Sequence, residues 1–92
     1  MAVKESALQR QIVDGLRAMG AEVFITHDSK HKPVTPGISD IIAVFAGRIL
    51  FVECKADGGR LSREQAAFLE RMRAKGHVAI VARSWEDVEA YL

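Results

Sequence analysis

Apolar residues recur near the start of the chain at the spacing of an amphipathic helix. The members of this series are Leu8, Ile12, Leu16 and Met19. Intervals of four, four and three residues place these side chains on one helix face. Gly20 suits the left-handed residue that commonly follows a helix end. The pattern therefore predicts a helix over residues 4–19.

Shorter apolar runs, separated by turn residues, predict the remaining elements. Strands are expected over 21–26, 40–46, 48–56 and 77–82, and further helices over 62–75 and 85–92. Gly47 separates the second and third strands, which is typical of a hairpin. Ser62 and Gln65 have the spacing of a capping box. The segment 27–39 contains both prolines and no periodicity, so we expect a long loop there.

The order α-β-β-β-α-β-α, without an internal repeat, predicts an α/β fold with a mixed sheet flanked by helices. The strand over 40–46 is apolar on both faces, which favours helices on both sides of the sheet. We expect a single domain over residues 1–92. A domain of this size buries a modest fraction of its surface, so a partner subunit would help to stabilise it.

Composition narrows the class of protein but says little about its partners. A hydrophobic fraction of 49% with 27% charged residues argues against a disordered chain. No apolar run approaches the roughly 20 residues of a membrane helix, so no membrane association is expected. The single cysteine fits a reducing, cytoplasmic location. The net charge of +1 does not favour any partner.

Two acids and a lysine lie within the two central apolar runs. Asp40 begins the first run, and Glu53 and Lys55 lie near the end of the second. Because strand side chains alternate, Glu53 and Lys55 point to one side and Cys54 to the other. Burying such charges is costly unless they pair or bind a metal ion. We therefore expect Asp40 and Glu53 to hold a divalent cation, with Lys55 beside it. This arrangement predicts a site for phosphodiester hydrolysis.

An acid that begins one strand, followed by Glu-x-Lys on the next, resembles the PD-(D/E)xK nuclease superfamily with its restriction-endonuclease-like fold. More narrowly, the chain resembles the VRR-NUC family. The matching elements are Glu5, Gly37-Ile38-Ser39-Asp40, Glu53-Cys54-Lys55 and Gln65. One departure is Ser39, which stands where the superfamily's name places proline. That proline shapes the backbone and does no chemistry, so the departure leaves the metal site intact.

The resemblance implies a Mg²⁺- or Mn²⁺-dependent endonuclease that acts on DNA, with a role for each matching residue. Asp40, Glu53 and the backbone carbonyl of Cys54 would be the metal ligands. Lys55 would stabilise developing charge, Gln65 would orient Lys55 or a phosphate oxygen, and Glu5 would hold an outer water or a second ion. Small relatives of this kind resolve Holliday junctions or other branched DNA as homodimers, which sets the same expectation here.

Other readings of these residues stay open at the level of sequence. Asp40 could serve only to hydrogen-bond the backbone amides of its own loop. Glu53 and Lys55 could be a charged pair on an edge strand that faces solvent. Gln65 has its capping role, and Glu5 suits the first turn of a helix. His27 and His31 lie in a loop without thiol partners, so phosphate contact or solvent exposure is favoured over zinc binding. Residues expected to contact DNA, because they flank the site, are Lys30, Lys32, Ser39, Arg60 and Arg63.

Two rival functions follow from the same residues. The first keeps the fold without turnover, as a catalytically inactive or partner-dependent DNA-binding module. The second is a structural or protein-interaction domain with a charged strand. Salt-dependent affinity for DNA separates the second rival from a nuclease, because phosphate contacts weaken as salt rises.

Overall fold

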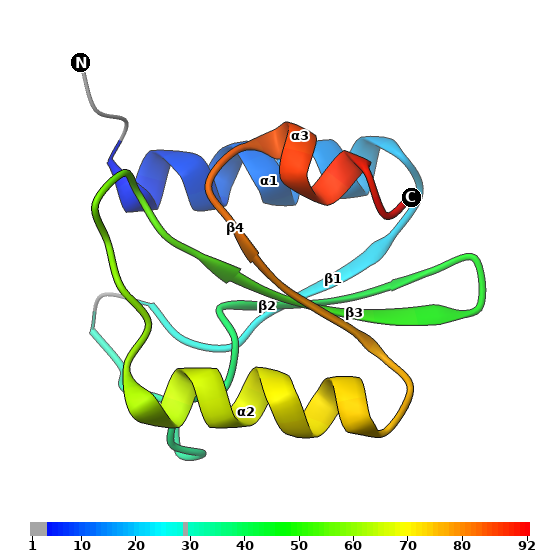
Figure 1. Ribbon diagram of the computed structural model, residues 1–92. Helices are drawn as coiled ribbons and strands as arrows, with labels where there is room; N and C mark the ends of the chain where they lie inside the picture. Colours follow the sequence, from blue (N-terminus) through cyan, green and yellow to red (C-terminus); the bar gives the residue numbers. More distant parts are fainter. Residues whose placement is uncertain (1–3, 29) are drawn as a thin grey trace.

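A four-stranded mixed sheet with helices on both faces forms the protein (Figure 1), which the computed structural model describes for residues 4–28 and 30–92. The elements are α1 (Glu5–Ala18), β1 (Glu22–Ile25), β2 (Ile41–Phe45), β3 (Arg48–Cys54), α2 (Arg63–Ala74), β4 (Val78–Ala82) and α3 (Trp85–Glu89). The strand order is β1-β2-β3-β4, and only the β3–β4 pair is parallel. The predicted α/β fold is therefore confirmed, although β3 ends before Lys55 and α3 ends before Leu92.

Two apolar clusters hold the helices against the sheet. On one face, α1 and α3 pack through Leu8, Ile12, Leu16 and Val88. On the other face, α2 packs Phe68 and Leu69 against Phe51 of β3. The capping box at the start of α2 is present, because Ser62 and Gln65 each bond the backbone amide of the other.

A tight hairpin fixes the register on which the site depends. Ala46 and Gly47 both have positive φ, as a two-residue turn between right-twisted strands requires. The turn pairs Ile41 with Val52, and the same register continued by one residue brings Asp40 level with Glu53. The hairpin thus places two carboxylates, thirteen positions apart in sequence, on neighbouring strands.

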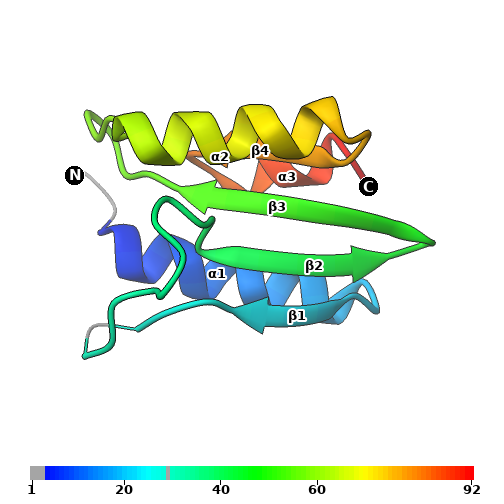
Figure 2. The same cartoon turned by 90° about the horizontal axis from the view of Figure 1, so that it is seen from below.

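The segments that carry the predicted site residues meet at one end of the sheet. There the chain leaves β1, enters β2, leaves β3 and begins α2 (Figures 1 and 2). The hairpin tip lies at the opposite end. None of the helices formed by the described residues has the length and apolar character needed to span a bilayer.

Candidate active site

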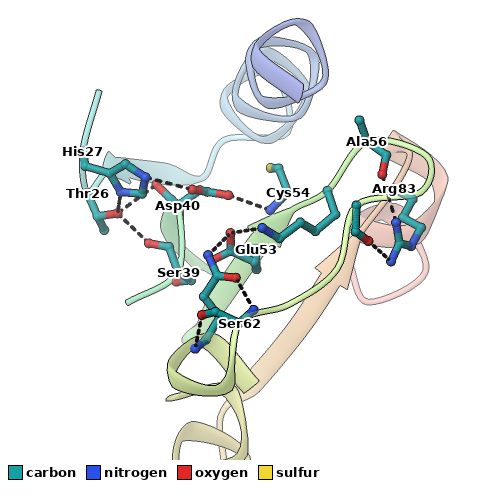
Figure 3. Close-up of polar contacts among 12 residues, drawn as sticks. Thr26, His27, Ser39, Asp40, Glu53, Cys54, Ala56, Ser62 and Arg83 are labelled. Atoms are coloured by element: carbon teal, nitrogen blue, oxygen red, sulfur yellow. Dashed lines mark hydrogen bonds and ion pairs between the residues drawn. The ribbon is translucent and has the colours of Figure 1, made fainter. Parts of the chain in front are cut away.

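Asp40 and Glu53 are charged residues buried at this end of the sheet, with side chains exposed by only a few per cent. Asp40 Oδ2 accepts a hydrogen bond from the backbone N–H of Cys54 at 2.8 Å (Figure 3). This bond crosses the hairpin and does not lie within the loop that precedes Asp40. The β3 backbone therefore orients the Asp40 carboxylate toward Glu53.

Glu53 is held in an environment that disfavours its charge. Burial, and then the adjacent Asp40 carboxylate, raise the pKa of Glu53 from 4.5 to about 9, although Lys55 acts in the opposite direction. Lys55 Nζ lies 3.9 Å from Glu53 Oε2. Because β3 is an interior strand and Glu53 is buried, the reading of these two residues as a solvent-facing edge-strand pair is wrong.

The carboxylate pair fits a divalent cation. Among the described residues, Glu53 Oε1 is a buried oxygen with no hydrogen-bond partner, which is costly without a ligand. Residues 4–28 and 30–92 contain no group of three or more His, Cys, Asp or Glu side chains placed to hold a metal. A cation here would use Asp40, Glu53 and further oxygens from backbone and water. Mg²⁺ commonly binds in this way, since it keeps several waters.

Gln65 caps α2 and also contacts the site, through Glu53 and not through the Lys55 contact that the resemblance implied. Its Oε1 accepts the backbone N–H of Ser62, which completes the cap of α2. Its Nε2 donates to Glu53 Oε2 at 3.2 Å. The start of α2 is therefore tied directly to the carboxylate pair, and Glu53 Oε2 is shared between Gln65 and Lys55 (Figure 3).

His27 belongs to the site through a contact with Asp40 that the sequence pattern did not predict. Its Nε2 lies 3.2 Å from Asp40 Oδ1, and its Nδ1 lies 3.1 Å from the Thr26 hydroxyl (Figure 3). Thr26 in turn donates to the backbone carbonyl of Ser39. Asp40 is thus held from both sides, by His27 at one oxygen and by Cys54 at the other. His31 instead pairs with exposed Asp28.

Arg83 is a second residue that the sequence did not indicate. Its guanidinium donates to the backbone carbonyls of Ala56 and Gly59, at 3.0 and 2.8 Å. These carbonyls delimit the turn directly after Lys55 (Figure 3). The parallel pairing of β3 with β4 brings Arg83 beside this turn. Arg83 therefore fixes the backbone that follows Lys55.

The remaining predicted residues differ in their access to solvent. Lys30, Lys32, Arg60 and Arg63 are exposed around the site, as a DNA contact requires. Ser39 is fully buried and donates its hydroxyl to the Ile41 carbonyl, so its expected DNA contact is corrected to a structural role. Glu5 lies at the exposed start of α1 and lines a groove that reaches Asp40. The Cys54 side chain lies in the core, where burial raises the pKa of its thiol.

Similar proteins share this fold over nearly the whole chain. The profile of the VRR-NUC domain matches residues 1–86. "Putative nuclease p44" of Acyrthosiphon pisum secondary endosymbiont phage 1 is 31% identical over 98% of this chain and 92% of its own length. A solved VRR_NUC domain has 25% identity and a TM-score of 0.75, over 97% of this chain and 94% of its own. A second, a VRR_NUC domain protein, has 21% identity and a TM-score of 0.76, over 99% and 86%. The chain belongs to the VRR-NUC domain family.

Proposed function

We propose that the protein is a metal-dependent endonuclease that hydrolyses phosphodiester bonds in branched DNA. Membership of the VRR-NUC family and the phage relative named as a nuclease support the nuclease activity. The observation that carries the metal dependence is the buried Asp40–Glu53 pair, with one unpartnered carboxylate oxygen and the Lys55 ammonium 3.9 Å away. A buried carboxyl pair with a purely structural role would not leave that oxygen without a hydrogen bond.

Each residue of the site has a task in this reaction. A divalent cation bound by Asp40 and Glu53 would supply Lewis-acid polarisation of the phosphate. Lys55 donates hydrogen bonds to the phosphate oxygens or to the attacking water, where negative charge develops. Gln65 holds Glu53 in place, and His27 with the Cys54 amide holds Asp40. Water adds to phosphorus as the bond to the leaving sugar oxygen breaks.

Cleavage of labelled duplex, flap and four-way-junction DNA tests the proposal. With Mg²⁺ or Mn²⁺ we expect cutting that EDTA abolishes, fastest on a branched substrate. Lys55→Ala should slow single-turnover cleavage by roughly 100-fold, because one charge-stabilising group is lost. It should keep the metal-induced rise in melting temperature, since Lys55 is not a ligand. DNA binding in Ca²⁺ without cutting of any substrate would instead favour the inactive or partner-dependent module.

We further propose that the active form is a homodimer. β1 is an edge strand, and the side chains of Phe24 and Val44 are 53% and 42% exposed on the sheet face that α2 covers only over β3 and β4 (Figure 2). Light scattering should give a dimer mass at micromolar protein. Phe24→Asp should yield monomer, while Val34→Asp, at an apolar loop residue that is 99% exposed, should not. A monomeric wild type would exclude the dimer.

A further inference from the structure

A groove beside the carboxylate pair extends along α1 beyond the residues that have been given a role so far. It has a volume of about 510 Å³ and runs between α1 and the chain that leaves β1, with Asp40 and His27 in its wall. Its volume lies in the range of nucleotide- and drug-sized sites. The groove is therefore continuous with the place where the phosphodiester bond would be cut.

One row of α1 residues forms the wall opposite β1. Ser6, Arg10, Val13 and Arg17 follow at intervals of four, three and four, so they lie in line along the helix. Half-exposed Ile25 supplies apolar surface between the polar groups, and Val13 is buried at the base of the groove. Arginine side chains beside apolar surface suit a flexible ligand that alternates anionic groups with less polar ones. The sugar–phosphate chain of a DNA strand has this character.

The two arginines in this row are available to an anion. Within residues 4–28 and 30–92, no ion pair or side-chain hydrogen bond engages Arg10 or Arg17. Seven residues of helix separate them by about 10 Å, so their long side chains can reach different phosphates of one strand. Two phosphates of a single strand could therefore be contacted at once.

Four acidic side chains also line the groove, those of Glu5, Asp14, Asp28 and Asp40. Asp28 accepts hydrogen bonds from the backbone amides of Lys30 and His31. Asp14 lies four residues after Arg10 and three before Arg17, so both cations are its neighbours on the helix. Glu5 and Asp40 lie at the end where a divalent cation would bind. Farther along the groove, Arg10 and Arg17 are the cationic side chains of the lining, with Asp14 between them.

We infer that this groove binds the DNA strand on one side of the bond that is cut, with phosphates on Arg10 and Arg17 and a sugar against Ile25. The inference rests on the proposed nuclease function and specifies how its substrate is held. The cleaved strand then passes from α1, across Asp40 and Glu53, toward Lys55 and the exposed Arg60.

Fluorescence anisotropy of four-way-junction DNA in Ca²⁺, over a series of salt concentrations, tests the inference. The doubly substituted Arg10→Ala, Arg17→Ala protein should bind about ten-fold more weakly, and the slope of log K against log salt should fall by about two. Arg48→Ala is the matched control, since it removes an exposed arginine at the distant hairpin and should change neither quantity. Arg10→Lys with Arg17→Lys should largely restore binding.

The outcomes separate this inference from the proposed function. A wild type that binds and cuts DNA, with a double alanine variant that binds like Arg48→Ala, would overturn the groove and leave the nuclease. A wild type that neither binds nor cuts would overturn both. Melting temperatures of the two double variants check that the fold persists, and a lysine variant as weak as the alanine variant would also overturn a phosphate contact.

Discussion

Glu53→Gln is expected to abolish metal-dependent cleavage and, at the same time, to stabilise the metal-free protein. Folding holds the pKa of Glu53 at about 9, against 4.5 for the free side chain. Between these pH values the folded protein keeps a proton that the unfolded chain releases. Folded stability therefore falls as pH rises through this window, by up to about 1.4 kcal/mol per pH unit. Glutamine has no such titration, so this loss disappears.

Melting curves from pH 5 to pH 9 measure this effect directly. Without metal, Glu53→Gln should melt close to the wild type at pH 5 and increasingly above it toward pH 9, by about 4–8 °C for each kcal/mol gained. Mg²⁺ should raise the melting temperature of the wild type and leave that of the variant unchanged. Glu22→Gln removes an exposed carboxylate from the same sheet and should match the wild type in every assay. Equal pH dependence and equal cleavage in Glu53→Gln would show that Glu53 is not a metal ligand.

Most of the fold follows from local pattern. Apolar intervals and turn residues located every helix and strand, and the hairpin at Ala46–Gly47 fixed the register that brings Asp40 level with Glu53. A pair of acids on neighbouring hairpin strands can therefore be predicted from their distance to the turn. The burial of Glu53 could not be predicted from that distance, because it depends on how α2 and its Gln65 pack over the sheet.

The supporting residues of the site were missed for a different reason. His27 reaches Asp40 through the path of a loop that has no periodicity, and Arg83 reaches the turn after Lys55 through the parallel pairing of β3 and β4. Neither path is encoded in residue spacing. Arg10 and Arg17 differ, because their intervals along α1 were visible in the sequence. What was absent was the position of β1 beside them, which turns a helix face into a groove.

Gly37→Ala is expected to destabilise the protein severely and to impair cleavage as well. Gly37 has a φ of 77°, a conformation that alanine adopts at a cost of about 1–2 kcal/mol. A Cβ atom there would also collide with the backbone carbonyl of Glu64 and approach the amide of Gln65. The loop before Asp40 and the first turn of α2 would have to separate. Together we expect a loss of about 3 kcal/mol or more, and a fall in melting temperature of roughly 10–20 °C.

Gly58→Ala isolates the contact from the backbone effect. Gly58 has a similar φ of 80°, but an added Cβ would meet no atom within 4 Å. It should therefore show only the backbone cost of about 1–2 kcal/mol. Urea unfolding of both variants measures the difference, and equal stabilities would contradict close packing of Gly37 on α2. Because that packing positions Gln65 against Glu53, the folded fraction of Gly37→Ala should also cleave more slowly than Gly58→Ala under identical metal and DNA concentrations.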